Sequence, residues 1–215
     1  MMTKQRWEQI GAASGIAFVL LQLISQALIQ IGGSEPAFTA SAQEIVSFFE
    51  NRDLSLAPIG SFLSSLSVVA FLFFLGALWA ALSRKEESPS WMSHIAFGSG
   101  LVGAAVTLGG GGWVLAFMRI EEGLDPASAR LLFDQGNFAF AQFWVPLAVM
   151  VLATGIVSLR DGALPGWFGW FSLVTSLALL ISRAFWTSPA GLAFLGYMLF
   201  WLWLIIASVL LIRRA

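Results

Sequence analysis

The chain alternates between six long apolar stretches and short segments that contain charges, glycine or proline. Each stretch holds about twenty apolar residues, the length of helix needed to cross the roughly 30 Å of bilayer hydrocarbon. A water-soluble domain of 215 residues cannot bury six such helices, so the pattern predicts an all-α, polytopic membrane protein with a six-transmembrane-helix bundle. The stretches cover residues 10–31, 58–82, 91–117, 138–159, 167–186 and 189–212.

Two of the connecting segments carry the start signals of a short helix. Ser41 and Glu44 have the spacing of a capping box, in which each side chain bonds the backbone amide of the other residue. Asp125 before Pro126 supplies a cap and a residue suited to the first helical turn, and Gly136 is a plausible stop. Helices this short are unstable alone in water, so we expect them on the outer membrane face or over the bundle. They are predicted over residues 41–52 and 126–135.

Basic residues are unevenly divided between the two ends of the predicted spans. If the N-terminus is cytoplasmic, the inner side carries seven basic residues and the outer side four, which satisfies the positive-inside rule. We therefore expect both termini in the cytoplasm of a cell whose membrane the chain crosses six times. The inner residues are Lys4, Arg6, Arg84, Lys85, Arg160, Arg213 and Arg214, and the outer ones are Arg52, Arg119, Arg130 and Arg183.

Composition narrows the chemistry that the chain can perform. Charged residues make up 11% of the sequence, against about 25% in soluble domains, as a lipid environment demands. The absence of cysteine excludes disulfides, thiolate metal sites and cysteine nucleophiles. A net charge of −1 argues against nucleic-acid binding, which needs a basic surface. The single histidine, His94, is predicted at the inner membrane interface, and we expect no metal, cofactor or catalytic residues.

Polar residues inside the spans form the main functional signal. Gln22, Gln26 and Gln30 are four residues apart and therefore line one face of the first predicted helix. Four consecutive glycines in the third span weaken its helix by about 1 kcal/mol each relative to alanine. Non-helical backbone in a membrane is tolerated only where protein or a water-filled cavity covers it. The other candidates at this depth or at the outer mouth are Gln142, Asn137, Arg183, Gly109, Gly110, Gly111 and Gly112.

Two interpretations of these polar residues remain open. In the first, the glutamines hydrogen-bond neighbouring helices and hold the bundle together, and Arg183 extends to the outer interface. In the second, they line a polar cavity in the outer half of the bundle, with the glycine segment in its wall. Ser61, Ser64 and Ser65 would share that cavity, and Pro146 would kink the fourth span beside it.

Small residues predict which helix faces pack together. In lipid, close approach of helices depends on such residues, and Gly11 and Gly15 place two of them one turn apart. Ser172 and Ser176 do the same in the fifth span. The sixth span is bulkier, with Trp201, Trp203 and only one hydroxyl over residues 199–211, so it is predicted to be an outer, lipid-facing helix.

Two segments carry a resemblance to a known group of proteins. They are Pro36-Ala37-Phe38-Thr39-Ala40-Ser41-Ala42-Gln43-Glu44-Ile45-Val46-Ser47-Phe48-Phe49-Glu50-Asn51-Arg52 and Leu164-Pro165-Gly166-Trp167-Phe168-Gly169-Trp170. Together with the order of spans, they resemble an uncharacterised family of bacterial six-helix integral membrane proteins. The resemblance implies a bacterial inner-membrane location and no particular activity or site.

Three functional hypotheses follow. The first is a non-enzymatic membrane protein that binds a small or lipidic molecule, or a partner protein, in the outer half of the bundle. The second is a small transporter or channel, alone or as an oligomer, with a pathway past Gln22, Gln26 and Gln142. The third, a membrane enzyme, is the weakest because no nucleophile, base and orienting group come together in the sequence.

Overall fold

The structure of the protein is a computed structural model that describes residues 3–31, 35–51, 55–120, 123–187 and 192–214. The described chain is helical and contains no strand. Six helical stretches within it are long and apolar enough to cross a membrane, which confirms the predicted all-α, six-span fold of a multi-pass membrane protein. The helices are α1 (Lys4–Gln30), α2 (Ala42–Glu50), α3 (Ala57–Ser83), α4 (Trp91–Gly109), α5 (Gly112–Arg119), α6 (Pro126–Gln142), α7 (Trp144–Asp161), α8 (Gly166–Ala184) and α9 (Leu192–Arg214).

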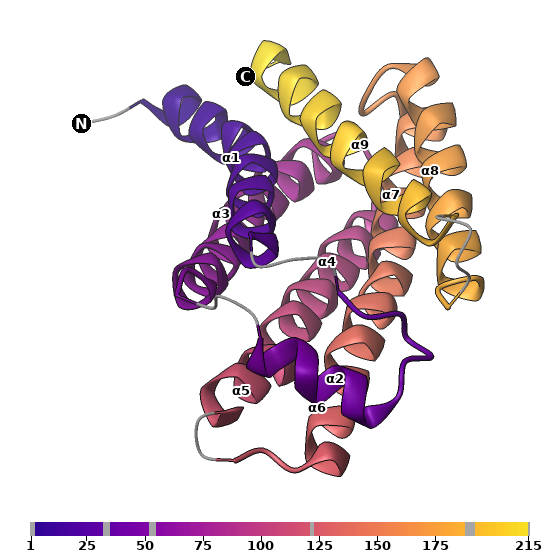
Figure 1. The fold of residues 1–215 in the computed structure, drawn as a ribbon. Helices are drawn as coiled ribbons and strands as arrows, with labels where there is room; N and C mark the ends of the chain where they lie inside the picture. Colours follow the sequence, from indigo (N-terminus) through magenta and orange to yellow (C-terminus); the bar gives the residue numbers. More distant parts are fainter. Residues whose placement is uncertain (1–2, 32–34, 52–54, 121–122, 188–191, 215) are drawn as a thin grey trace.

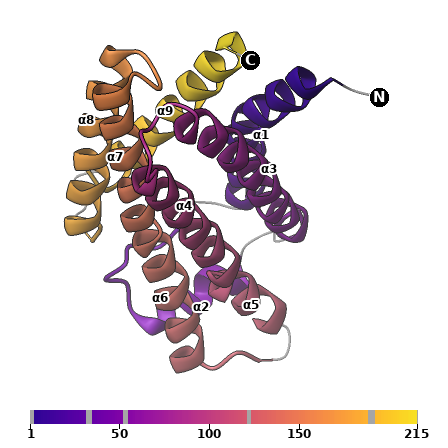
Figure 2. The same cartoon turned by 180° about the vertical axis from the view of Figure 1, so that it is seen from behind.

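The long helices form a closed ring (Figures 1 and 2). In the order α1, α3, α4, α7, α8 and α9, each helix packs against the next, and α9 returns to α1. Both chain ends and the loops after α3 and α7 lie at one end of this ring, which we call the terminal end. On the terminal side, the ring is filled by aromatic and aliphatic side chains that are almost fully buried, including Phe74, Leu75, Met150, Phe200 and Trp203.

The opposite end carries a small helical cap, which we define as α2, α5 and residues 126–137 of α6. Its own apolar core is separate from the core of the ring and contains Ile45, Phe49, Ala116, Ala129 and Phe133. The three helices lie together at the bottom of Figure 1. The two predicted short helices therefore meet each other over the end of the bundle.

Both predicted helix starts are confirmed at atomic detail. The Ser41 hydroxyl accepts from the Glu44 amide at 3.2 Å, and the Glu44 carboxylate accepts from the Ser41 amide at 2.6 Å. The Asp125 carboxylate accepts from the amides of Ala127 and Ser128 at the start of α6. These bonds occupy amides that have no partner within the helix itself, so the local sequence is sufficient to set the start of α2 and α6.

The predicted stop at Gly136 is wrong, because α6 continues through it to Gln142 and meets α7 at Phe143. This part of α6 packs closely against the start of α5. A Cβ on Gly112 would lie 2.7 Å from the Leu132 carbonyl oxygen and 3.3 Å from the Gly136 nitrogen. The interruption at Phe143 precedes Pro146, which has no amide hydrogen to donate to the carbonyl of Gln142.

The prediction that residues 199–211 form a lipid-facing helix is also wrong. α9 lies between α1 and α8, and Phe200, Trp203 and Leu204 on it are fully buried. The indole nitrogen of Trp203 donates to the Ser172 hydroxyl across 2.7 Å. The large side chains of α9 therefore fill the middle of the ring, where small residues on neighbouring helices leave room for them. The predicted start of this span at Pro189 lies outside the described residues.

The predicted packing faces of the first and fifth spans are confirmed. Gly11 and Gly15 are buried, and a Cβ on Gly15 would lie 2.3 Å from the Ser208 hydroxyl and 2.7 Å from the Phe74 ring. Ser172 and Ser176 are buried as well, and the Ser176 hydroxyl donates to the Ala148 carbonyl at 2.8 Å. α1 thus approaches α3 and α9 closely, and α8 approaches α7.

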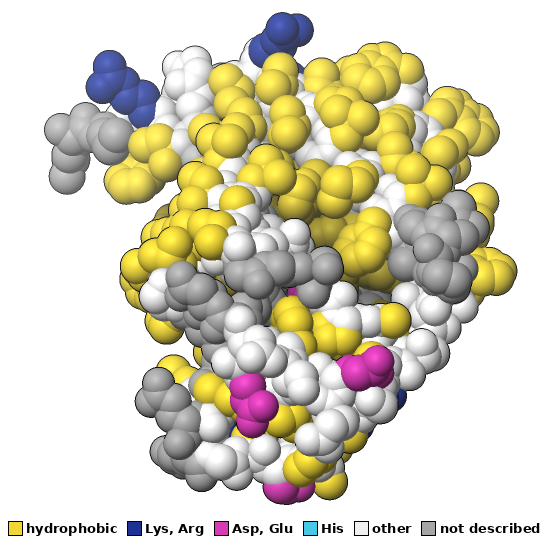
Figure 3. All heavy atoms as spheres, in the orientation of Figure 1, with side chains coloured by type: hydrophobic (Ala, Val, Ile, Leu, Met, Phe, Trp, Pro, Cys, Tyr) yellow, Lys and Arg dark blue, Asp and Glu magenta, His cyan; other side chains and the backbone are white. Residues whose placement is uncertain are grey.

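The face shown in Figure 3 differs in charge between its two ends. The large basic side chains visible there lie at the terminal end, and the acidic ones lie over the cap, although Arg130 of the cap pairs with Asp134. Between the two ends, the surface is dominated by apolar side chains, as expected for helices that contact lipid. Arg52, which the sequence analysis assigns to the outer side, lies outside the described residues.

Candidate functional site

Two adjoining cavities lie in the half of the ring nearest the cap. The first, of about 140 Å³, is at the centre of the ring, and we call it the ring-centre cavity. The second, of about 430 Å³, lies between α3 on one side and α4 and α5 on the other, and we call it the lateral cavity. Ser64, Thr107 and Gly110 line both, so the two cavities adjoin across a shared wall, and together they make up the candidate site.

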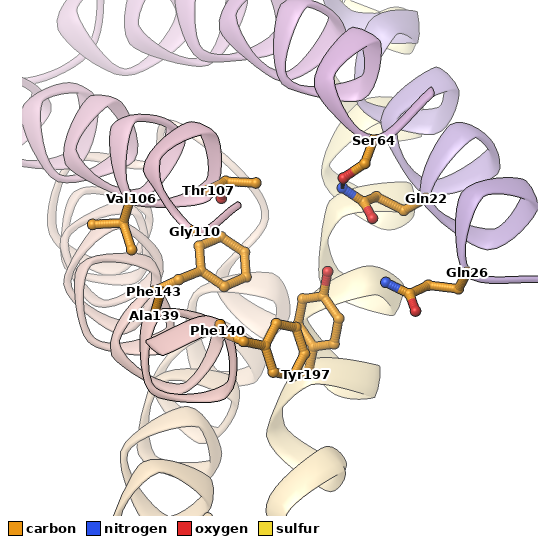
Figure 4. Close-up of a pocket in the computed structure, with 11 residues that line it drawn as sticks. Gln22, Gln26, Ser64, Val106, Thr107, Gly110, Ala139, Phe140, Phe143 and Tyr197 are labelled. Atoms are coloured by element: carbon orange, nitrogen blue, oxygen red, sulfur yellow. Dashed lines mark hydrogen bonds between the residues drawn. The ribbon is translucent and has the colours of Figure 1, made fainter. Parts of the chain in front are cut away.

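The ring-centre cavity is lined by residues from five helices (Figure 4). α1 contributes Gln22 and Gln26, α3 contributes Ser64, and α9 contributes Tyr197. The opposite wall comes from the end of α4 and from α6, and it includes Thr107 and aromatic rings at 140 and 143. Because these residues lie up to 175 positions apart in the sequence, only closure of the ring brings them together.

The three glutamines of α1 have different environments. Gln22 is 4% exposed, and its side-chain amide donates to the hydroxyls of Ser67 at 2.8 Å and Ser64 at 3.4 Å. Gln26 is half-buried, points into the cavity and makes no hydrogen bond within the described part of the chain. Gln30 is exposed and lines neither cavity. Gln22 is therefore structural, and Gln26 is the glutamine whose amide faces open space.

The hydroxyl of Tyr197 points into the same space as the amide of Gln26 (Figure 4). The ring of Tyr197 is held by edge-to-face contacts with Phe140 and Phe143, whose centroids lie 5.3 and 5.8 Å away. The Thr107 hydroxyl donates to the Gly103 carbonyl of its own helix at 3.0 Å, which leaves its lone pairs toward the cavity. The wall thus offers both donors and acceptors.

The glycine segment lies in the wall of the lateral cavity. All four glycines from Gly109 to Gly112 line it, and the helix is interrupted there, with α4 ending at Gly109 and α5 beginning at Gly112. Residues 91–117 are therefore not one continuous helix, because four glycines supply no side chain to stabilise the turn. The interrupted backbone lines the lateral cavity, and Gly109 is exposed.

Gln142, Asn137 and Arg183 lie outside both cavities. Arg183 donates to the Gln142 carbonyl oxygen at 3.3 Å, and its guanidinium lies 5.4 and 5.7 Å from the ring centroids of Phe138 and Trp186. The Asn137 amide donates to the Phe133 carbonyl of its own helix. Arg183 and Gln142 thus join α8 to α6, and none of the three residues lines a cavity with Gln22 and Gln26.

No charged side chain lines either cavity within the described part of the chain. A buried acid, Glu86, lies at the terminal end between α3 and α4. Burial by itself raises the pKa of Glu86, but hydrogen bonds from Ser93 and Met92, together with Arg160, outweigh that effect and hold it below its usual range. Glu86 therefore anchors the start of α4, and the site itself is electrically neutral.

Sequence reasoning missed Tyr197, Thr107 and Glu86. The first two lie in otherwise apolar spans, where one hydroxyl gives no periodic signal, and only the ring shows that they face Gln26. Glu86 has a stronger signal, since it is an acid shortly before a helix start. His94 is exposed, with its ring nitrogen 2.6 Å from the Ser90 carbonyl, in keeping with an interface position.

The described lining of the site is suited to hydrogen bonding. Its described lining contains hydroxyls, amides and backbone groups, without a base beside any hydroxyl. The described part of the chain contains no cluster of three His, Cys, Asp or Glu side chains suited to a metal ion. No protein-family model, curated protein or solved structure matches the chain. The resemblance of the two segments to a bacterial six-helix family therefore stays a prediction.

Proposed function

We propose that the protein is a non-enzymatic membrane protein that binds one small, uncharged molecule in the joined cavities beneath the cap. The observation that carries this proposal is the Gln26 amide, which faces the ring-centre cavity without a hydrogen-bond partner in the described chain. An amide within the membrane region that lacks a partner is costly, so a bound molecule or water is expected to occupy the space. The lateral cavity, at about 430 Å³, falls within the usual range of ligand pockets.

The proposed setting is the inner membrane of a bacterium, with the terminal end in the cytoplasm and the cap outside. The concentration of basic side chains at the terminal end supports this orientation (Figure 3). The cavities would then lie in the outer half of the membrane, under a cap that contacts the outer solution.

Co-purification of a ligand tests the binding proposal. The protein is extracted in mild detergent, and non-covalently bound molecules are identified by native mass spectrometry. Thr107→Phe places a ring in the wall shared by both cavities and is expected to abolish the bound mass. Val102→Phe adds the same side chain to an exposed position of α4, and should leave it unchanged. An identical spectrum for both variants and the wild-type protein would contradict the proposal.

Transport is the second candidate function, and the two helix interruptions favour it. The breaks between α4 and α5 and between α6 and α7 both lie beside the cavities, and discontinuous helices are typical of transporter sites. In the structure, however, Phe71, Phe74, Phe200 and Trp203 pack ring against ring on the terminal side and close the route. Flux of the co-purified molecule into liposomes, lost in Gln26→Leu, would establish transport.

A further inference from the structure

The wall of the lateral cavity is also part of the outer surface of the bundle. Leu108 and Leu115 line the cavity and are 58% and 50% exposed, and Ser65 opposite them on α3 is exposed as well. On α3, the neighbouring outward side chains Phe62, Leu66 and Val69 are apolar and exposed. The cavity therefore opens sideways, between α3 and α4–α5, onto a surface that faces lipid.

The length of α3 indicates where the opening would lie in a bilayer. α3 has 27 residues and is therefore about 40 Å long at 1.5 Å per residue, which exceeds the hydrocarbon thickness of about 30 Å by roughly 5 Å at each end. Ser65 lies eight residues after Ala57, about 12 Å from the cap end of α3. With α3 centred across the bilayer, a molecule that enters beside Ser65 would come from the lipid phase rather than from the outer solution.

The two cavities differ in their balance of apolar and polar groups. The lateral cavity includes the apolar side chains of Ile29, Val68, Leu108, Val114 and Leu115, beside the hydroxyls of Ser61, Ser64, Ser65 and Thr107 and the amide of Gln135. The ring-centre cavity beyond it presents the Gln26 amide and the Tyr197 hydroxyl, and neither cavity has a charged side chain in its described wall. Amides and hydroxyls both donate and accept, as a ligand hydroxyl does, whereas a charged head group would be buried here without a counterion.

We propose that the ligand is a membrane lipid with an uncharged, hydroxyl-bearing head group, which enters sideways between α3 and α4–α5. Its head group occupies the ring-centre cavity, where Gln26 and Tyr197 bind the hydroxyls, and its chain passes through the lateral cavity to the bilayer. This inference rests on the proposed binding function and adds to it the class of ligand and the route of entry.

Photocrosslinking in nanodiscs tests the inference. The protein is placed in phosphatidylcholine nanodiscs that contain a small fraction of a diazirine-bearing diacylglycerol, or of phosphatidic acid with the same acyl chains. A third sample receives a water-soluble diazirine derivative of glycerol. Crosslinked peptides are then mapped by mass spectrometry. We expect the diacylglycerol probe to label the cavity walls on α3 and α4, and the two other probes to label them at background level.

A matched pair of variants reports on the head-group site. Gln26→Leu should reduce cavity labelling by the diacylglycerol probe roughly tenfold, the effect expected when a buried polar partner is lost. Gln30→Leu makes the same change one turn away, at an exposed position outside the cavities, and should leave labelling unchanged. Thermal unfolding shows whether Gln26→Leu is folded. If it is not folded, the labelling experiment uses Thr107→Phe in its place, with the same expected loss of labelling.

The outcomes separate this inference from the proposed function. Equal labelling of the cavity by phosphatidic acid would overturn the neutral head group. Labelling by the glycerol probe alone would overturn lateral entry of a lipid and would leave the binding function intact. Absence of cavity labelling by all three probes, together with no co-purified molecule, would overturn both.

Discussion

The side-chain amide of Gln22 donates to the Ser67 hydroxyl across 2.8 Å and connects α1 to α3 beside the ring-centre cavity. Ser67 is fully buried and itself donates to the Ser64 carbonyl at 2.6 Å, so it acts as acceptor and donor at once. Gln26, one turn further along α1, has no comparable partner in the described chain. Two glutamines on one helix face therefore have different roles, which a pair of equivalent substitutions can separate.

Replacement of these two glutamines should affect stability unequally. Gln22→Leu removes an interhelical hydrogen bond and is expected to lower the free energy of unfolding by about 0.6–1.7 kcal/mol, the range measured for such bonds in membrane proteins. Gln26→Leu removes no bond within the described chain and should leave stability unchanged or slightly higher. Unfolding of both variants in the same detergent, followed by circular dichroism, measures the difference. An equal loss in both would show that Gln26 also holds the bundle together.

The two tryptophans of α9 should differ in the same way. Trp203 is fully buried and donates to Ser172, whereas the indole nitrogen of Trp201 is buried without a partner in the described chain. Trp203→Phe should cost roughly 1–3 kcal/mol of stability through lost volume and the lost hydrogen bond to Ser172. Trp201→Phe removes an unsatisfied donor and should cost less. The thermal unfolding midpoints of the two variants measure the difference. A larger decrease for Trp201→Phe than for Trp203→Phe would contradict the prediction.

We expect Glu86, at the terminal end, to stabilise the folded protein in a pH-dependent way. Its carboxylate accepts from the amides of Met92 and Ser93 and from the Ser93 hydroxyl, and its pKa in the folded protein lies below the usual value. A lowered folded-state pKa stabilises the fold above the unfolded pKa of about 4.3, and this contribution disappears as the pH falls through the folded value. The stabilisation is therefore complete at neutral pH.

The variant Glu86→Gln measures that contribution. At pH 7 it should lower the free energy of unfolding by about 1–3 kcal/mol, because charged hydrogen bonds to a buried acceptor are lost. The difference from the wild-type protein should shrink below about pH 4, where the carboxylate becomes protonated. Glu87→Gln, an adjacent exposed position, is the control and should show neither effect. A difference that stays constant with pH would contradict the assignment.

Arg130 of α6 connects the cap to the segment that precedes α2. Its guanidinium donates to the carbonyls of Phe38 and Ala40 and pairs with Asp134 at 2.8 Å. Arg130→Ala should therefore increase amide exchange in the cap while leaving α7 and α8 protected, because the cap has its own small core. Hydrogen–deuterium exchange read by mass spectrometry tests this. Uniform loss of protection across the ring would show that cap and ring unfold as one unit.

The orientation of the chain can be tested directly because the sequence contains no cysteine. A single cysteine at Gln43 lies on the exposed surface of the cap, and one at Glu87 lies at the terminal end. With the cap outside, a membrane-impermeant maleimide should label Gln43→Cys in intact cells and Glu87→Cys only after lysis. The reverse pattern would invert the proposed topology.

The polar site shows how far sequence reasoning reaches. Gln22, Gln26 and the glycines from Gly109 to Gly112 could be selected because polar or helix-weakening residues are expensive in lipid. The same criterion selected Gln142 and Arg183, which instead bind each other between α6 and α8. The high free energy of a polar residue in lipid shows that the residue must be shielded from lipid. It does not show whether the residue packs against protein or lines a cavity.

The sequence by itself determined which segments lie in the membrane, where α2 and α6 begin, and which small-residue faces pack. These properties depend on local composition, because lipid and unpaired backbone amides act on each segment separately. The tertiary structure alone decided that α9 closes the ring, that α6 runs through Gly136, and that Tyr197 faces Gln26. Those outcomes depend on how side chains of distant helices fill a common space, which no single segment encodes.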